Sequence, residues 1–281
     1  MIELNNGMKM LQRGLGVFQV TDEAACESAV LSALEIGYRM VDTAACYGNE
    51  RAVGNAVRRS GIARDEIFLV SKVWIQDASY ERTMRSFEKT LKNLQTDYLD
   101  LYLIHMPYGD YHGAWRAMEE LQRQGRVRAI GVCNFLEDRL VDLILSHDIK
   151  PAVNQIELHP FCRQTRLREV MEKYGIKAMA WAPFAEGNCG IFTDESLKAI
   201  GQKYGKTPAQ VILRWLVQQG IIVIPKSVHA ERQRENFDID DFSLSDADMK
   251  VIDSMDRGRP LILDITSLSE VYRLHGITFE Q

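Results

Sequence analysis

The sequence lacks the features that mark secreted, membrane-spanning and nucleic-acid-binding proteins. Its first seven residues have neither the cationic nor the apolar region of a signal peptide, and no apolar run approaches the roughly 20 residues that cross a bilayer. The net charge is −5 and the pI about 5.8, so no basic field attracts nucleic acid or anionic lipid. We therefore expect a cytoplasmic protein that binds neither membranes nor nucleic acid.

The cysteines lack the spacing of a disulfide framework or a zinc site. Five are present, an odd number, and no two follow a C-x-x-C pattern: Cys26, Cys46, Cys133, Cys162 and Cys189. Free thiols in a reducing compartment fit this distribution best. We expect neither disulfides nor a bound metal.

No stretch rich in proline, glycine and serine divides the chain, and apolar residues make up 46% of it. Short apolar β-type runs alternate with segments of helical periodicity instead. We expect strands at residues 15–20, 38–41, 67–70, 98–104, 127–132, 152–155, 176–181 and 221–224. Helical patterns follow at residues 22–36, 49–59, 79–94, 113–124, 137–146, 164–174 and 208–218, with a shorter one near 193–204.

Eight such alternations in 281 residues favour an α/β fold of the (β/α)8 TIM-barrel type, with residues 1–281 forming a single domain. Most strands are apolar throughout, as expected where both faces of a parallel sheet are buried. An open, doubly wound sheet is the alternative. It is disfavoured because Gly14-Leu15-Gly16 is only a fragment of the G-x-G-x-x-G pattern that such folds carry between an early strand and helix.

The stretch from Tyr38 to Glu50 carries the first chemical signal. It places Asp42 at the end of a strand and Tyr47 on the following loop, five residues later. Taken alone, the stretch fits a plainer reading equally well, in which Asp42 caps the next helix and Tyr47 packs on its flank.

Two further groups stand at equivalent places. Lys72 follows the third strand and His105 the fourth, at spacings of 30 and 33 residues, each about one βα unit. Functional residues of such barrels lie at the C-terminal ends of the strands, so Asp42, Tyr47, Lys72 and His105 should converge. Any one of them alone would favour a cap, a rim lysine or a half-buried histidine. The four together favour a catalytic site.

The chemistry of this set is that of carbonyl reduction. A phenol has a pKa of about 10, and we expect the Lys72 ammonium to lower the pKa of Tyr47. Asp42 would keep Lys72 charged and aimed, while His105 donates a hydrogen bond to a carbonyl oxygen. One histidine, one aspartate and one lysine form a poor ligand set for a metal.

These residues, in the contexts VDTAACYGNE, VSKVW and LYLIHMP, resemble the catalytic tetrad of the aldo-keto reductases. The resemblance extends from GLGVF at residues 14–18 to ENF at residues 235–237, and is greatest to the bacterial branch of 2,5-diketo-D-gluconate and glyoxal or methylglyoxal reductases. It implies that Tyr47 is the proton donor, that Lys72 and Asp42 tune it, and that His105 orients the substrate.

The same resemblance implies a nicotinamide dinucleotide across the barrel mouth. NADPH is favoured over NADH because Lys226 and Arg232, with Ser227 between them, can bind a 2′-phosphate. The nicotinamide end would contact Cys133, Asn134 and Gln155, with Trp181 stacked on the ring. The remaining cofactor contacts would be a pyrophosphate loop of Pro183, Phe184, Ala185 and Gly187, then Val228 and His229 near the phosphate, and Glu235 and Asn236 at the adenine.

Small aldehydes, dicarbonyls and sugar-derived ketones are the expected substrates. The expected pocket wall is Phe18, Trp74, Met106 and Tyr108, while Tyr111 and Phe184 fit a pocket wall and a core or rim position equally. The loop after the fourth strand is short and the tail beyond Asp256 has 25 residues. Family members that take steroids have longer loops there, so the resemblance implies a more open pocket. We expect a monomer, and only modest sensitivity to oxidation at Cys46.

Other functions remain compatible with the fold. They are an NADPH-binding sensor or regulatory subunit, a structural protein recruited from an enzyme, and a prostaglandin-synthase-like activity that uses reversible hydride transfer. An intact tetrad argues against the first two, because neither binding nor a structural role requires it.

Overall fold

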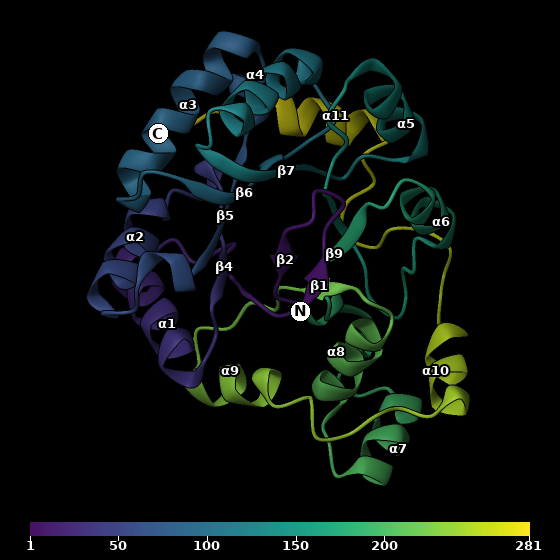
Figure 1. Cartoon of the computed structure of the whole chain (residues 1–281). Coiled ribbons are helices and arrows are strands. Elements are labelled where there is room, and N and C mark those ends of the chain that lie inside the picture. The colour runs from purple at the N-terminus through teal and green to yellow at the C-terminus, as the bar shows by residue number, and fades with distance from the viewer.

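The computed structural model describes all 281 residues, and eight parallel strands form a barrel at its centre (Figure 1). Each strand pairs with the next along the chain: β3 (Leu15–Gly16), β4 (Met40–Asp42), β5 (Phe68–Val73), β6 (Leu99–Ile104), β7 (Val127–Cys133), β8 (Val153–Glu157), β9 (Lys177–Trp181) and β10 (Ile222–Val223). Parallel bridges from Arg13 to Val223 and from Gly16 to Lys226 join the first strand to the last. The barrel is therefore closed, which confirms the TIM-barrel prediction over the open sheet.

A ring of helices surrounds the strands: α1 (Glu23–Ile36), α2 (Glu50–Arg59), α3 (Tyr80–Leu94), α4 (Tyr111–Arg123), α5 (Glu137–Ser146), α6 (Thr165–Lys173), α7 (Glu195–Tyr204) and α8 (Pro208–Gln218). Their ends lie within two residues of the predicted ones because the stop and start chemistry is local. The Asp22 side chain accepts from the backbone N–H of Ala25, and Gly37 ends α1 with a φ of 123°. None of the helices is both long enough and apolar enough to cross a membrane.

Several elements were not foreseen. They are the hairpin of β1 (Ile2–Glu3) and β2 (Lys9–Met10), and the helices α9 (Ala230–Phe237), α10 (Asp246–Asp253) and α11 (Leu268–His275). Strands of two residues leave no periodicity to detect. The hairpin lies across one end of the barrel (Figure 1), and Leu4 and Met10 join the apolar cluster that fills its interior. It closes the end of the barrel where the strands begin.

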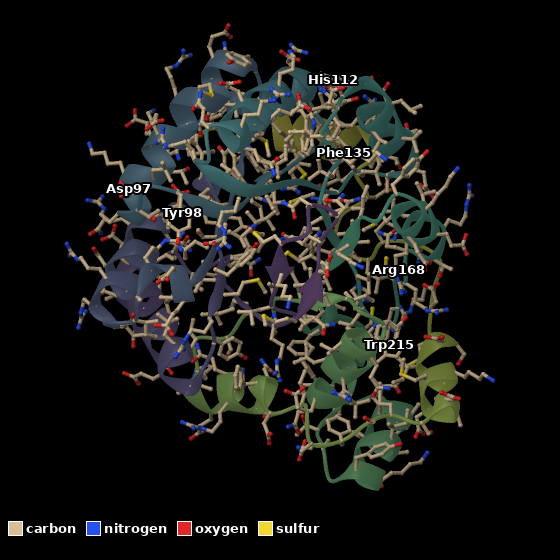
Figure 2. All side chains as sticks on the ribbon, in the orientation of Figure 1. Asp97, Tyr98, His112, Phe135, Arg168 and Trp215 are labelled. Atoms are coloured by element: carbon tan, nitrogen blue, oxygen red, sulfur yellow. The ribbon has the colours of Figure 1, made fainter.

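The apolar core has two layers. Fourteen buried residues, among them Met40, Leu101 and Met179, form a cluster whose members come mainly from the barrel strands. A larger cluster of 56 residues lies between strands and helices. Two of its members, Phe135 and Trp215, are labelled in Figure 2. At the edge of this cluster, the Trp215 indole on α8 donates a hydrogen bond of 2.9 Å to Asp253 on α10. Close packing on both faces makes the strands a stiff support for residues at their ends.

The C-terminal tail folds back on the barrel. The Trp74 indole donates to the carbonyl of Ile277 at 3.0 Å, and the Gln76 amide donates to the carbonyl of Phe279 at 3.1 Å. Farther back, the buried carboxylate of Glu157 accepts from the backbone N–H groups of residues 261–263 at 2.6–3.3 Å. These contacts fix the tail beside the C-terminal ends of the strands.

Candidate active site

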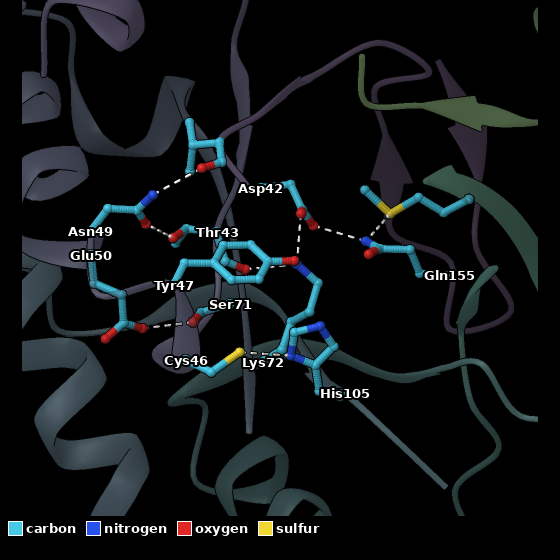
Figure 3. A network of polar contacts seen from close by, with 12 residues as sticks. Asp42, Thr43, Cys46, Tyr47, Asn49, Glu50, Ser71, Lys72, His105 and Gln155 are labelled. Carbon is cyan, nitrogen blue, oxygen red and sulfur yellow. Dashed lines mark hydrogen bonds and ion pairs between the residues drawn. The ribbon is translucent and has the colours of Figure 1, made fainter. Parts of the chain in front are cut away.

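The four candidate catalytic residues come together at the C-terminal end of the barrel (Figure 3). Asp42 ends β4, Lys72 lies near the end of β5, and His105 follows β6 directly. Tyr47 ends the short helix η1 (Ala45–Tyr47), which Gly48 terminates at a φ of 69°. The parallel pairing of β4, β5 and β6, which sets Asp42 opposite Val70 and Lys72 opposite Leu103, brings the three strand ends together.

Lys72 is the centre of the site. Its Nζ donates to Asp42 Oδ1 at 2.6 Å and to the carbonyl of Thr43 at 2.7 Å, and lies 3.4 Å from the Tyr47 hydroxyl. Asp42 and Lys72 are both almost wholly buried. Burial raises the pKa of Asp42, while the Lys72 charge and the hydrogen bonds from Lys72 and Gln155 oppose the rise. The lysine therefore has a charged partner on one side and a phenol on the other.

The pKa of the Tyr47 phenol differs from the prediction. Its pKa lies well above the ordinary value, first because of burial and then because of the Asp42 carboxylate. The expectation of a lowered pKa is therefore wrong, because burial and the Asp42 carboxylate raise the pKa of Tyr47 in spite of the neighbouring Lys72. The phenol stays protonated at neutral pH, which is the form that can donate a proton.

His105 is held as a neutral ring. It is 8% exposed, and burial together with the Lys72 charge lowers its pKa well below 6.5. The edges of Trp74 and Tyr47 pack against it, with ring centroids 5.0 and 5.6 Å away. The Cys46 Sγ lies 3.4 Å from its Nδ1. A neutral imidazole has one N–H to donate and one lone pair.

Two polar residues that support the loop escaped the sequence reasoning. The buried Asn49 amide donates to the carbonyls of Val17 and Val20 at 2.9 and 3.1 Å, and accepts from the Thr43 hydroxyl at 2.7 Å. Glu50, 2% exposed, accepts from Ser71 at 2.7 Å. At these two positions the sequence pattern indicates only the start of a helix. Their adjacency to Tyr47 and Gly48 was the available signal.

The candidate nicotinamide residues line the neighbouring strand ends. Asn134, in the left-handed region at a φ of 61°, accepts from the Trp181 indole at 2.9 Å and donates to the carbonyl of His105 at 3.1 Å. Gln155 donates to Asp42 Oδ2 at 2.8 Å, a contact that the sequence did not predict. Cys133 belongs to the barrel-interior cluster. The Asn134 amide thus links the Trp181 indole to the backbone carbonyl of the candidate residue His105.

The candidate pyrophosphate loop is strained. Ala182, Ala185, Glu186 and Cys189 all have positive φ values between 46° and 56°, which cost of order 1–3 kcal/mol each for residues other than glycine. Pro183 and Ala185 are buried, and Gly187 is exposed. Phe184 packs on Phe192 at 5.4 Å between centroids. The Phe184 ring therefore contacts the segment that follows this loop.

The candidate phosphate site is an open cationic helix start. Lys226, His229 and Arg232 are exposed and form no ion pair, and His229, the N-cap residue of α9, makes no side-chain cap hydrogen bond. Ser227 accepts from the backbone N–H of His229 at 3.1 Å. Unpaired cations beside free helix N–H groups fit a phosphate.

The other residues of this segment differ in exposure and in their hydrogen bonds. Val228 is 41% exposed beside the cations, and Asn236 is buried and makes no side-chain hydrogen bond. Glu235, expected at the adenine, accepts a short hydrogen bond from Thr207, the N-cap residue of α8. An adenine contact would compete with that bond.

The candidate pocket wall is partly covered. Trp74 and Met106 are 4% and 6% exposed and cluster with Leu274 of α11, while the Tyr108 hydroxyl donates to the carbonyl of Ile265 at 2.5 Å. Phe18 is 48% exposed, with its ring 5.0 Å from that of Tyr47. The tail therefore narrows the side that was expected to be open. Tyr111 packs edge-on against Phe135 in the main core, so it is no pocket wall.

Comparison with known proteins agrees with this geometry. Residues 3–257 match the model of the family described as the Aldo/keto reductase family. The chain is 47% identical to the glyoxal reductase of Bacillus subtilis over 257 residues, which are 91% of this chain and 92% of that protein. It is 44% identical to the methylglyoxal reductase DkgA of Yersinia pestis over 264 residues, 93% and 94% of the two chains.

A solved structure has the same fold and a bound cofactor. It is a mutant of Gox0644 in complex with NADPH, with a TM-score of 0.89 and 38% identity, covering 99% of this chain and 98% of that one. The family model covers most of the residues that build the barrel, and the two curated relatives match over nearly their whole length. The chain belongs to the aldo/keto reductase family.

Proposed function

We propose that this chain reduces small aldehydes, dicarbonyls or sugar-derived ketones to alcohols with NADPH. The observation that carries the proposal is the buried unit in which Lys72 Nζ lies 2.6 Å from Asp42 and 3.4 Å from the Tyr47 hydroxyl. The glyoxal and methylglyoxal reductases among its relatives support dicarbonyl substrates, and the solved complex with NADPH supports the cofactor.

Bound NADPH supplies the hydride that reaches the carbonyl carbon. Tyr47 gives its phenolic proton to the carbonyl oxygen as negative charge develops there. Lys72, 3.4 Å away, stabilises the phenolate that this transfer leaves. Asp42, which accepts a hydrogen bond from Gln155, holds Lys72 in place, and neutral His105 donates a hydrogen bond that aligns the carbonyl. The raised pKa of Tyr47 keeps the proton available until the substrate needs it.

We assign the cofactor to the barrel mouth between β7 and α9. Unpaired Lys226 and Arg232 support a 2′-phosphate contact, and the Asn134–Trp181 pair supports a placed nicotinamide ring. The other proposed contacts are Cys133, Gln155, Pro183, Phe184, Ala185, Gly187, Ser227, Val228, His229, Glu235 and Asn236. On the substrate side we propose Phe18, Trp74, Met106 and Tyr108.

We also propose that residues 1–281 act as one domain, as a monomer in the cytoplasm. The last residue supports the single domain, because the Gln281 amide donates to Thr90 on α3 at 2.7 Å and to Glu50 on α2 at 3.2 Å. All four proposed catalytic groups come from one chain, and all five cysteines are free. Light scattering during gel filtration measures the oligomeric state directly.

The test is NADPH consumption with methylglyoxal, glyceraldehyde, a diketogluconate and an aromatic aldehyde. Tyr47→Phe should lower kcat by about 10²–10⁴-fold, the usual contribution of a general acid, and leave NADPH affinity nearly unchanged. Tyr174→Phe is the matched control, because that hydroxyl makes no hydrogen bond and lies at the end of α6. It should behave as wild type.

Two outcomes would count against the proposal. Binding of NADPH without turnover of any carbonyl would favour a sensor or regulatory subunit. Full activity in Tyr47→Phe would assign the proton transfer to another group.

A further inference from the structure

Cys46 contacts the ring of His105 at its Nδ1 edge. The residue is half-buried in η1, directly before Tyr47, and its Sγ lies 3.4 Å from His105 Nδ1 (Figure 3). This is the only polar side-chain contact of the ring, so Nε2 on the opposite edge has no partner from the chain. Which nitrogen carries the single ring proton then depends on the thiol.

The chemistry of the pair favours one arrangement. Burial raises the pKa of the Cys46 thiol to about 12, so the sulfur keeps its proton at neutral pH. The imidazole is neutral, since its pKa is lowered. A thiol donating to the Nδ1 lone pair is a better bond than an Nδ1–H donating to a thiol, because uncharged sulfur is a weak acceptor. The S–H···Nδ1 bond places the ring proton on Nε2.

We propose that Cys46 is a positioning residue that fixes the tautomer of His105, so that the Nε2–H faces the substrate carbonyl. The inference rests on the proposed reductase function, in which His105 donates to that carbonyl. In the other tautomer Nε2 carries a lone pair, which repels a carbonyl oxygen. Cys46 thus acts through His105 and touches neither the reacting atoms nor the cofactor.

A purely structural role makes a different prediction. Cys46 also packs beside Trp74, Met106 and Leu274, so its removal could act through loosened packing alone. Packing loss would lower the melting temperature without changing which ring nitrogen is protonated. The tautomer is therefore the quantity to measure.

The direct test is ¹⁵N NMR of the full-length protein labelled at histidine, with His105→Gln used to assign the ring signals. Protonated and unprotonated ring nitrogens have well-separated shifts. In wild type we expect His105 to carry its proton on Nε2 alone. In Cys46→Ala we expect a mixture of both neutral tautomers. A proton on Nδ1 in wild type, or an unchanged ring in Cys46→Ala, would overturn the proposal.

Kinetics provide the second readout. Cys46→Ala should lower kcat/KM for methylglyoxal by about 3–10-fold, the size expected from one weak hydrogen bond, with NADPH affinity unchanged. Cys46→Ser restores a donor with a shorter reach, so it should recover part of the loss and the Nε2–H signal. Cys26→Ala is the control, since Cys26 is also a free cysteine, is buried in α1 and makes no side-chain hydrogen bond. Equal losses in Cys26→Ala and Cys46→Ala would also overturn the proposal.

The two readouts separate this inference from the function on which it rests. If wild type reduces no carbonyl, the reductase assignment fails, while the NMR spectra still decide whether the thiol fixes the ring. If wild type is active and the tautomer is insensitive to Cys46, only the inference fails.

Discussion

Two buried aspartates, at opposite ends of the same barrel, use a cation in different ways. Asp42, at the C-terminal ends of the strands, is 2% exposed and pairs with Lys72 at 2.6 Å. Asp100, near the start of β6, is 1% exposed and pairs with Arg64 and Arg128 at 2.9 Å each. Both carboxylates are removed from water, and both accept further hydrogen bonds.

The difference lies in what the cations do next. The Arg64 and Arg128 side chains are 22% and 48% exposed, and the first also donates to the carbonyls of Ile67 and Tyr98. Their hydrogen bonds link the first residues of β6 and β7 to the segment before β5. Lys72 is 0% exposed and keeps the Tyr47 hydroxyl within reach. The Asp100 group, at the lower end of the barrel where the strands begin, holds strands together. The Asp42–Lys72 pair, at the upper end where the strands finish, keeps a charge available for catalysis.

The largest expected effect comes from breaking the upper pair. Lys72→Met should lower kcat by about 10²–10⁴-fold, because the phenolate formed at Tyr47 loses its stabilising charge. It should also cost about 3–5 kcal/mol of unfolding free energy by leaving Asp42 unpaired. Steady-state kinetics and urea unfolding measure the two effects.

The control is the double variant Asp42→Asn with Lys72→Met. It removes the uncompensated carboxylate, so stability should return toward wild type while turnover stays low. Recovery of turnover in the double variant would show that Lys72 has only a structural role.

A change at Asp100 should lower stability and leave activity nearly unchanged. Asp100→Asn removes the charge that both arginines share and should lower the free energy of unfolding by about 2–3 kcal/mol. We expect kcat/KM to stay close to wild type, because Asp100 lies at the far end of the barrel from the tetrad. Loss of activity in the folded variant would mean that the two ends are coupled.

The sequence predicted the barrel and the upper site for the same reason. Strand ends are read from local hydrophobic runs, and equal βα spacing brings Asp42, Lys72 and His105 to one place. The hairpin that closes the lower end left no such pattern, since each of its strands has two residues. Its position depends on the packing of Leu4 and Met10 in the barrel interior, which is a tertiary contact that the local sequence does not reveal.

The direction of the pKa shift at Tyr47 could not be predicted from the sequence. The lysine beside Tyr47 suggested a lowered pKa, but the balance depends on burial and on Asp42, whose depth no motif reveals. The position of the tail was equally hidden. Its contacts with Trp74 and with Gln76 join residues about 200 positions apart in the chain. Such pairings follow from the closed fold and from no local pattern.

Lys226 and Arg232 form a third set of cations, and unlike the cations beside Asp42 and Asp100 they are exposed and form no ion pair. Lys226→Ala and Arg232→Ala should each weaken NADPH binding by about 10-fold, as expected for a charge-assisted bond to phosphate, and leave NADH binding and stability nearly unchanged. Fluorescence titration with both cofactors measures the difference. Arg234→Ala, an exposed arginine on the same helix, is the control. Equal losses for NADPH and NADH would remove the 2′-phosphate from the assignment.

The smallest expected effect is a pH dependence of stability at the upper end of the barrel. The pKa of His105 is lowered in the folded state, so below about pH 6.5 the unfolded chain binds a proton that the folded chain refuses. Stability from this group is complete above pH 6.5 and falls as the pH drops, by at most about 1.4 kcal/mol per pH unit.

His105→Gln should therefore lose less stability than wild type between pH 7.5 and 5.5 in urea unfolding. His147, whose pKa burial also lowers, keeps its own contribution in both proteins, so the slope should decrease without vanishing. Equal slopes would mean that His105 titrates normally and that the upper site is wetter than its burial indicates.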